Sequence, residues 1–283
     1  MTQPNQLSPN LQLDQEAATP AAQVSLKRKI MLVLPAYNEE ESIVQLLTNI
    51  QQAMLFHSLE YEITVLDDGS TDRTLEIARS CASRMPLRIL RHLKNAGLGA
   101  TIRDGLSDAV QRAGEHDIIV TMDADNSHTP GLILRMVRAI DEGCDVVIAS
   151  RFVSNAQVRG VNLFRRMLSR GASMLFQAVL PIPGVRDYTC GYRAYRSALL
   201  RGAFDRYRQS FVDQEGFQCM IDILLKLSTM TDTVFGEVPM ILRYDLKMSQ
   251  SKMRVASTIA GSLKLLLRRR LEFWMRGTPP SSP

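Results

Sequence analysis

Cysteines, aromatic residues and long apolar runs are scarce in this 283-residue sequence. The four cysteines are far apart and form no CxxC pair, so neither a zinc site nor a disulfide framework is indicated. No stretch offers the roughly 18 consecutive apolar residues that a membrane-spanning helix needs. Aromatic residues make up 6% of the chain, and no basic motif interleaves with them. The net charge of +5 therefore does not indicate a nucleic-acid partner.

The remaining composition is typical of a globular protein. Hydrophobic residues make up 45% and charged residues 22% of the chain, which is enough to bury a substantial core. Residues 1–28 are polar and lack the basic start and apolar run of a signal peptide. We expect a disordered lead-in over 1–28, an α/β domain over 29–250, a basic amphipathic helix over 251–276 and a tail over 277–283.

Apolar runs alternate with amphipathic stretches in the first half of the chain. The apolar runs predict buried strands at 30–34, 61–66, 87–90, 117–122 and 145–149. The amphipathic stretches predict helices at 40–54, 72–83, 100–112 and 130–142. This alternation predicts a mainly parallel sheet flanked by helices. Thr129 and Pro130 fit the start of the fourth helix, as a capping threonine and a first-turn proline.

The alternation stops after Ser150. The second half predicts a basic amphipathic helix near 163–180, a turn with glycine and arginine, one more helix and a strand near 233–244. We therefore expect a nucleotide-sugar half over 29–150 and an acceptor half over 151–250.

Polar, mostly acidic residues follow three of the predicted strands. Ligands of open α/β sheets bind beyond the carboxyl ends of the strands, so these positions are candidate binding residues. The residues after the first strand are Pro35, Ala36, Tyr37, Asn38 and Glu39, and those after the second include Asp67 and Asp68. We expect Tyr37 to cover a nucleotide base, and the carboxylates to accept hydrogen bonds from the base and ribose.

Asp123 and Asp125 follow the fourth strand and can aim two carboxylates at one point. Such oxygens are the ligands that Mg²⁺ or Mn²⁺ prefers, and the cation would also neutralise a diphosphate leaving group. The alternative is that these acids cap the helix near Pro130, a place that Thr129 already fills. We therefore predict a divalent metal site at Asp123 and Asp125.

Residues 94–99 supply a cation, Lys94, and two glycines, Gly97 and Gly99, directly before a predicted helix. Such glycines permit either close backbone approach to phosphate or tight packing of the turn. Their spacing also admits a dinucleotide-binding oxidoreductase. That class, however, needs the glycines after the first strand and an acid that ends the next one. Here the glycines follow the third strand, and Asp117 begins a strand, so this class is disfavoured.

Arg165 and Ser169 are four residues apart on a predicted helix and share one face. With Arg151, which follows the fifth strand, they form a candidate cradle for one phosphate, because the planar donor fork of arginine suits that task. The alternative is a solvated basic helix face, which we favour for Arg166 and Arg170. A phosphate acceptor with a second pKa of about 6 is already an anion at neutral pH and needs no general base.

The ordered motifs PAYNEE, DDGSTDRT, KNAGLGA, DADNSHTP, SRF and DYTCGYR resemble the dolichyl-phosphate mannosyltransferase branch of the family-two inverting glycosyltransferases. The resemblance spans about residues 30–253. It implies a GT-A fold, a divalent metal, and transfer from a nucleotide sugar to a polyprenyl phosphate at the cytoplasmic membrane face. By the resemblance, Pro35, Tyr37, Glu39, Asp67 and Asp68 would hold the nucleotide, and Asp123 and Asp125 would bind the metal. We also assign Lys94, Gly97, Asp123 and Ala124 to the predicted nucleotide-sugar site. The implied acceptor-phosphate residues are Arg151, Arg165, Ser169, Lys247 and Lys252, and the implied catalytic residues are Asp125, Arg151 and Asp187.

The chain departs from this family pattern at two places. Ser127 stands where some relatives have a glutamine as a further metal ligand. In the usual Arg-x-x-Gly-x-Ser-Lys stretch, Ser251 and Lys252 match, but the arginine is replaced by Lys247 or reached from Arg243.

Three functions remain open from the sequence. The first is transfer of a hexose, with mannose from GDP-mannose expected first and glucose from UDP-glucose second, to a polyprenyl phosphate. The second is a family-two enzyme with a hydroxyl acceptor in polysaccharide or glycolipid synthesis, in which Asp187 would act as the base. The third is a non-catalytic nucleotide-sugar-binding protein, against which Asp123, Asp125 and Arg151 argue.

The carboxyl-terminal stretch, residues 251–276, combines apolar residues at helical spacing with seven basic residues and one acid. Phe273 and Trp274 follow the apolar positions, as in many helices that lie in a membrane interface. We expect this helix to bind an anionic membrane surface and to place a cytoplasmic protein peripherally on the membrane. The alternative is that its apolar face packs on the catalytic domain.

Overall fold

The computed structural model describes residues 28–160 and 163–243. The strands are β1 (Lys29–Ala36), β2 (Glu60–Asp67), β3 (Leu87–Arg91), β4 (Ile118–Thr121), β5 (Val146–Ser150), β6 (Gln157–Arg159), β7 (Arg193–Arg196), β8 (Phe235–Pro239) and β9 (Ile241–Arg243). The helices are α1 (Ile43–Phe56), α2 (Thr74–Cys81), α3 (Leu98–Arg112), α4 (Leu132–Asp141), α5 (Leu163–Val179), α6 (Ser197–Tyr207) and α7 (Gln218–Leu227), with a 3-10 turn η1 (Arg208–Val212).

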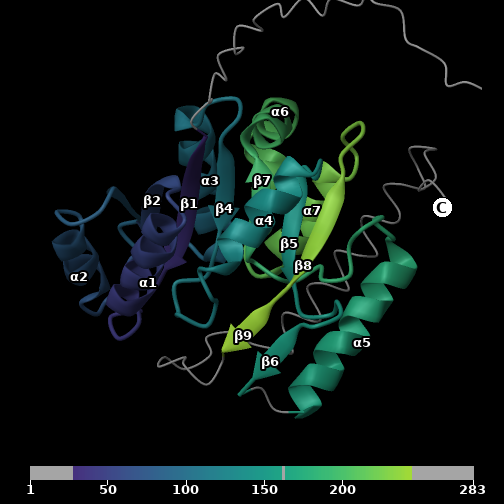
Figure 1. The fold of residues 1–283 in the computed structure, drawn as a ribbon, viewed down its shortest axis with the longest axis horizontal. Helices are drawn as coiled ribbons and strands as arrows, with labels where there is room; N and C mark the ends of the chain where they lie inside the picture. The colour runs from purple at the N-terminus through teal and green to yellow at the C-terminus, as the bar shows by residue number, and fades with distance from the viewer. Residues whose placement is uncertain (1–27, 161–162, 244–283) are drawn as a thin grey trace, which may run out of the picture.

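Seven strands form one sheet in the order β3, β2, β1, β4, β7, β5, β8 (Figure 1). The neighbours pair in parallel, except that β7 runs antiparallel to both β4 and β5. β6 and β9 form a separate parallel pair, which lies below the large sheet in Figure 1. β1 is therefore flanked by β2 and β4, and the loops that follow these three strands share one edge of the sheet.

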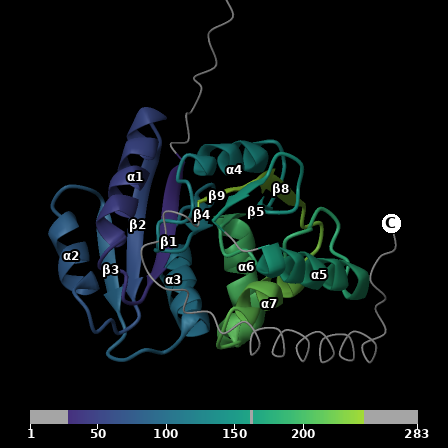
Figure 2. The same cartoon turned by 90° about the horizontal axis from the view of Figure 1, so that it is seen from below.

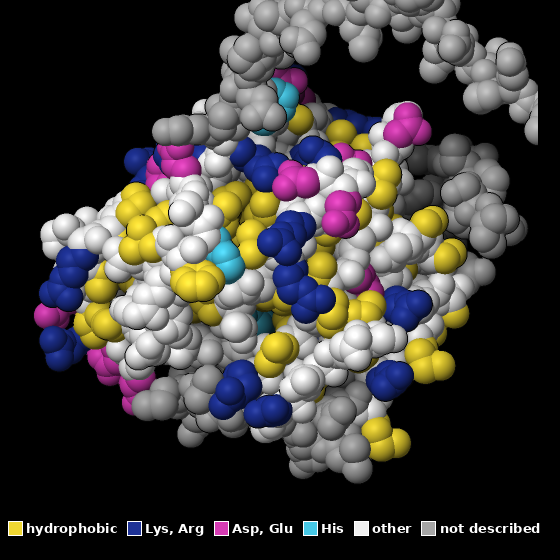
Figure 3. Space-filling view, in the orientation of Figure 1, with side chains coloured by type: hydrophobic (Ala, Val, Ile, Leu, Met, Phe, Trp, Pro, Cys, Tyr) yellow, Lys and Arg dark blue, Asp and Glu magenta, His cyan; other side chains and the backbone are white. Residues whose placement is uncertain are grey.

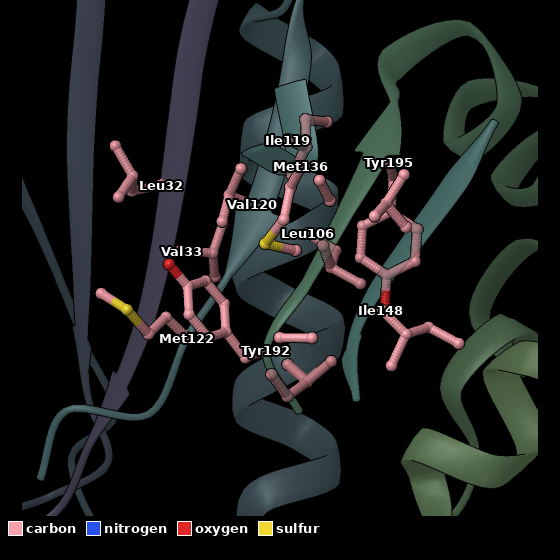
Figure 4. Packing of buried hydrophobic residues seen from close by; sticks show 14 of the residues in the cluster. Leu32, Val33, Leu106, Ile119, Val120, Met122, Met136, Ile148, Tyr192 and Tyr195 are labelled. Atoms are coloured by element: carbon pink, nitrogen blue, oxygen red, sulfur yellow. The ribbon is translucent and has the colours of Figure 1, made fainter. Parts of the chain in front are cut away.

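Helices cover both faces of the large sheet, with α1, α2 and α4 on one side and α3, α6 and α7 on the other (Figure 2). This double cover explains why β1 and β5 are apolar runs without alternation, since both faces of such strands are buried. Figure 4 shows the resulting core, in which Leu106 of α3 and Met136 of α4 lie among side chains of the sheet. Tyr192 and Tyr195, at β7, are fully buried in the same core.

The structure confirms the predicted alternation and the mainly parallel sheet. All five predicted strands and all four predicted helices of the first half are present, with ends shifted by a few residues. The predicted helix near 163–180 is α5, whereas the single helix expected after it is two, α6 and α7. The strand expected at 233–244 is divided into β8 and β9, which pair in different sheets. Strands β6 and β7 were not predicted.

The predicted cap of the fourth helix is wrong. Helix α4 begins at Leu132, and no side chain caps its first turn. The hydroxyl of Thr129 instead donates to the carbonyl oxygen of Ile241 (3.3 Å), because β9 passes beside this loop. Thr129 therefore ties the loop after β4 to β9.

None of the helices within residues 28–160 and 163–243 combines the length and apolarity that a membrane crossing demands. The predicted lead-in at 1–28 lies almost wholly outside the described residues, and so do the predicted helix at 251–276 and the tail at 277–283.

Candidate active site

The loops after β1, β2 and β4 meet at one edge of the sheet and are joined by hydrogen bonds. The backbone nitrogen of Asp68 donates to the carbonyl oxygen of Ala36 (2.8 Å), which links the second loop to the first. The hydroxyl of Ser42 lies 2.9 Å from Glu39 Oε2 and 3.1 Å from the carbonyl oxygen of Ala124, which links the first loop to the third. The three groups of residues predicted from sequence are therefore neighbours.

The loop after β1 is fixed to the loop after β2. Asn38 adopts a left-handed backbone conformation (φ 51°), and its backbone nitrogen donates to Ser70 Oγ (2.9 Å). The backbone nitrogen of Glu39 donates to Thr74 Oγ1 (2.7 Å), and the Glu39 side chain is buried. Pro35 and Tyr37 are half-buried beside these residues. Hydrogen bonds thus attach the predicted nucleotide-binding loop to its neighbour.

Asp67 and Asp68 differ in their surroundings. Asp67 is fully buried, and its Oδ2 accepts no hydrogen bond from any residue that the structure describes. Arg91 lies near that oxygen, with its Nε 3.7 Å away. A buried carboxylate oxygen without a donor is costly, so Asp67 is suited to a donor on a ligand, such as a base N–H.

Asp68 is already engaged by the protein. Its two carboxylate oxygens accept hydrogen bonds from the backbone nitrogens of Ala96 (2.8 Å) and Gly97 (3.0 Å). The ring of His92 lies 2.7 Å from the same carboxylate. Asp68 therefore anchors the loop of residues 94–97, on which Lys94 is exposed.

Gly97 and Gly99 lie at the amino end of α3, and their surroundings differ. Gly97 has a left-handed backbone (φ 87°) at the amino end of α3. The nitrogen of Gly99 donates to the carbonyl oxygen of Glu215 (2.8 Å), and a Cβ at Gly99 would lie 1.7 Å from the carbonyl oxygen of Gln214. The close approach at Gly99 is therefore made by the chain's own segment 213–216, which favours the packing interpretation of this glycine.

The loop after β4 carries the predicted metal ligands. The Asp123 side chain is 36% exposed, whereas Asp125 is buried and accepts hydrogen bonds from the nitrogen (3.0 Å) and hydroxyl (2.6 Å) of Ser127. His128 Nε2 lies 4.0 Å from Asp123 Oδ2, and its ring stacks on Tyr192. Within residues 28–160 and 163–243, no three His, Cys, Asp or Glu side chains converge into a complete metal site. Two carboxylates still fit Mg²⁺ or Mn²⁺, because such ions take their other ligands from water and phosphate oxygens.

Across this edge, the half-buried Arg151 forms an ion pair with the fully buried Asp187. Nε and Nη2 of Arg151 donate to the two oxygens of Asp187 (2.8 and 2.7 Å), and Nη2 also donates to Thr189 Oγ1 (2.6 Å). Burial would raise the pKa of Asp187, but the charge and hydrogen bonds of Arg151 outweigh burial and lower this pKa. Asp187 is therefore an ionised brace for Arg151, which favours the shaping role over that of a general base.

The motif that contains Asp187 reaches the metal loop as well. A Cβ at Gly191 would lie 3.2 Å from Asp123 Oδ1, so this turn borders the predicted metal ligand. Arg193, two residues later, is fully buried and donates to the carbonyl oxygens of Tyr188 (2.8 Å) and Met220 (2.7 Å). One turn thus positions both Arg151 and the surroundings of Asp123.

The remaining acceptor residues are only partly described. Arg165 and Ser169 both lie in α5, so the helical spacing holds; Ser169 is half-buried, and the Arg165 side chain lies outside what the structure describes. Lys247 and Lys252 lie outside the described residues. Arg243, at the end of β9, donates its backbone nitrogen to the carbonyl oxygen of Ser127 (3.0 Å). In Figure 3, basic side chains gather low on the face, over the region of β6 and β9.

Sequence reasoning missed three residues of this site. Ser42 joins two loops, His92 contacts Asp68, and His128 lies beside Asp123. His128 stands inside the DADNSHTP motif, so its position next to two acids was the available signal. His92 and Ser42 carry no such signal, because the contact of His92 with Asp68 and that of Ser42 with Ala124 join segments that are remote in sequence.

Comparison with known proteins agrees with this geometry. The profile of glycosyl transferase family 2 matches residues 31–204. Dolichol-phosphate mannosyltransferase of Pyrococcus furiosus is 33% identical over 199 residues, which cover 70% of this chain and 53% of the relative. Polyprenol monophosphomannose synthase of Mycolicibacterium smegmatis is 32% identical over 212 residues, which cover 74% of this chain and 76% of the relative. An undecaprenyl-phosphate 4-deoxy-4-formamido-L-arabinose transferase of Edwardsiella ictaluri is 34% identical over 184 residues, covering 64% and 53%. The chain thus spans about half the length of two of these relatives.

Solved structures support the fold. Glucosyl-3-phosphoglycerate synthase from Mycobacterium tuberculosis, crystallised with Mn²⁺, UDP-glucose and phosphoglyceric acid, aligns with a TM-score of 0.60 and 21% identity over 90% of this chain and 82% of that one. The same enzyme with Mg²⁺ and UDP aligns with a TM-score of 0.59 over 90% and 81%. These likenesses, together with the sheet order, confirm the GT-A fold expected from the sequence.

Proposed function

Because the chain belongs to glycosyl transferase family 2, we propose that it transfers a hexose from a nucleotide-diphosphate sugar to a polyprenyl phosphate. The observation that carries this proposal is the pairing of two unlike sites at one edge of the sheet. Three acidic loops offer acceptors to a nucleotide. The ion pair of Arg151 and Asp187 lies across from them and is joined to them through the turn at Gly191. The names of the curated relatives, which include polyprenyl-phosphate transferases, support the same choice of acceptor.

The donor is bound by the loops after β1, β2 and β4. Asp67, with its buried carboxylate oxygen, accepts a hydrogen bond from the nucleoside, and Tyr37 lies against the base. Asp123 and Asp125 hold Mg²⁺ or Mn²⁺, which neutralises the charge of the diphosphate leaving group. The names of two relatives refer to mannose, so mannose is the first choice of sugar, and glucose is the second.

The acceptor phosphate is itself the nucleophile. Arg151 is held in place by Asp187 and Thr189, and with Arg165 and Ser169 it orients the phosphate for attack on the anomeric carbon. No general base is needed, because the phosphate is already ionised. This agrees with the lowered pKa of Asp187, whose oxygens are filled by Arg151 and by the backbone nitrogens of Arg151 and Cys190.

A hydroxyl acceptor is the second candidate. It is favoured by the likeness to a structure that holds phosphoglyceric acid, which offers both a phosphate and a hydroxyl. That reaction needs a base near neutral pKa. Asp187 is the acid that borders Arg151, and its lowered pKa makes it a weak base, so the phosphate acceptor is preferred.

We further propose that the chain works at an anionic, cytoplasmic membrane face, where a polyprenyl acceptor resides. The basic and apolar stretch at 251–276 supplies the contact, with basic residues worth about 1 kcal/mol each near anionic lipid.

The test is a transfer assay with Mn²⁺ and a panel of nucleotide sugars that includes GDP-mannose and UDP-glucose, with and without a polyprenyl phosphate. We expect product only when the lipid phosphate is present. Asp125→Asn should lower transfer by at least about 100-fold at saturating metal while the circular dichroism spectrum is unchanged. Asp205→Asn, an exposed acid of α6, is the matched control. Turnover with a free hydroxyl acceptor alone would contradict the proposal, and near-normal turnover of Asp125→Asn would contradict the metal assignment.

A further inference from the structure

His92 lies between two carboxylates that come from different elements. It directly follows β3, and its backbone nitrogen donates to the carbonyl oxygen of Asp67 (2.8 Å). Its Nδ1 is 2.7 Å from Asp68 Oδ1, in the loop after β2, and its Nε2 is 3.1 Å from Asp104 Oδ2, on α3. The side chain is 19% exposed. Both ring nitrogens therefore face acceptors, an arrangement that only the doubly protonated ring satisfies.

The surroundings of the ring favour its charged form. Burial opposes the charge, but the hydrogen bonds and charges of Asp68 and Asp104 outweigh burial and raise the pKa of His92. Two arginines nearby are already paired with acids. Arg103 on α3 donates to Asp104 (2.9 Å), and Arg91 lies next to Asp67. The next residue with a charge along the loop, Lys94, is exposed.

The contacts of His92 continue to the donor edge. Asp68, which the ring contacts, accepts hydrogen bonds from the backbone nitrogens of Ala96 and Gly97. The loop of residues 94–97 in turn packs against the turn after Asp68, since a Cβ at Gly69 would lie 2.5 Å from the carbonyl carbon of Lys94. His92 thus joins α3, the loop 94–97 and the turn that carries Asp67 and Asp68.

We propose that protonated His92 is a positioning residue for donor binding, which acts through Asp68 on the loop 94–97 and on the orientation of Asp67. This inference rests on the proposed function, because it takes the nucleotide sugar to bind at this edge. The ring is charged at pH values below its raised pKa, and it loses one of its two carboxylate contacts as pH rises through that pKa. Donor affinity therefore falls in the same interval, which lies above the ordinary histidine value of about 6.5.

The experiment measures the dissociation constants of GDP-mannose and UDP-glucose by calorimetry with Mg²⁺ between about pH 6 and pH 9. Nucleotide sugars are the suitable probes, because their diphosphate lacks the terminal phosphate group whose second pKa of about 6 would titrate in this range. For the sugar that binds, we expect the affinity of the wild type to fall about fivefold across the interval, within the usual size of a coupling between sites. His92→Gln should bind weakly at every pH. His92→Lys, which keeps a charge, should show no such fall.

Two further variants make the result specific. His116→Gln removes an exposed histidine before β4, on the opposite edge of the sheet, and should follow the wild-type curve. Asp104→Asn removes one partner of the ring without touching Asp68, and should move the fall in affinity to lower pH. Nuclear magnetic resonance of the ring protons should give His92 a pKa above 6.5 in the wild type.

Tight binding by the wild type and by His92→Gln with the same pH dependence would overturn the inference and leave the proposed function intact. The absence of nucleotide-sugar binding by folded wild type at every pH would overturn the proposed function and, with it, this role of His92.

Discussion

Replacing Asp187 by asparagine should destabilise the protein strongly, because it leaves Arg151 without its charged partner. Breaking a buried ion pair from one side costs about 3 to 5 kcal/mol. Here Asp187 is fully buried, whereas the Arg151 side chain is 24% exposed and keeps its hydrogen bond to Thr189 Oγ1. Partial solvation and this remaining bond place the expected loss at the lower end, about 3 kcal/mol.

The assay is urea unfolding at pH 7 followed by far-ultraviolet circular dichroism. A loss of about 3 kcal/mol corresponds to a shift of the midpoint by roughly 1 M urea or more. The control Asp205→Asn, on the exposed surface of α6, should change the free energy of unfolding by no more than about 0.5 kcal/mol. The double variant Arg151→Met with Asp187→Asn removes both charges and should recover part of the loss.

The pH dependence has a defined sign. The folded pKa of Asp187 is lowered, so its contribution is fully present above the unfolded value of about 3.9 and is lost as pH falls through the folded pKa. The difference between the wild type and Asp187→Asn should therefore shrink in acid. A loss of less than about 1 kcal/mol for Asp187→Asn at pH 7 would refute the proposal that Asp187 holds Arg151. So would losses for the two single variants that add up to the loss for the double variant.

Three further outcomes are expected. Gly99→Ala should lower the free energy of unfolding by about 2 to 4 kcal/mol, since its Cβ would meet the carbonyl oxygen of Gln214. Gly171→Ala in α5, where no described residue lies within 4 Å of the added Cβ, is the control and should not destabilise. Arg165→Ala should raise the KM for polyprenyl phosphate about tenfold and leave the affinity for the nucleotide sugar unchanged. An equal loss of affinity for both substrates would show that Arg165 does not belong to the acceptor-phosphate site. The intact chain should co-sediment with anionic liposomes at low salt, and high salt or truncation after Ser251 should abolish binding. Failure of the intact chain to co-sediment at low salt would refute the proposal that it binds the membrane.

The first half of the fold was predictable because its signals are local. Runs such as β1 and β5 are buried on both faces, so their apolar sequence alone marks them as strands of a covered sheet. Parallel order then placed the residues after β1, β2 and β4 at one edge. The hydrogen bond of Ser42 to Ala124 joins the first of these loops to the third, and that of Asp68 to Ala36 joins the second to the first.

The second half depends on contacts between distant segments, which a single sequence does not display. β7 has only four residues and includes the buried Arg193, a residue type that does not indicate a central strand. β6 and β9 are short, and each is defined by the other. Thr129 was predicted as a cap from its neighbours along the chain, but its hydroxyl donates to Ile241, which no local rule anticipates.

The candidate site shows the same division. The sequence predicted which acidic residues belong to the site, but it did not predict which of them bind other parts of the protein and which are open to a ligand. Asp67 and Asp68 are adjacent and chemically identical, yet Asp68 is engaged by His92 and by the loop 94–97, while one oxygen of Asp67 accepts no hydrogen bond from the described residues. Only the tertiary contacts of Asp68 with the segment between β3 and α3 distinguish the two residues.

The place of β7 in the large sheet bears on how this chain can be divided. β5 pairs only with β7 and β8 in that sheet, and both come from beyond residue 150. A polypeptide that ended at Ser150 would carry β5 with neither of its partners, and β4 with an open edge ready to join foreign strands. Proteolysis or genetic splitting at the loop after β5 should therefore yield fragments that aggregate.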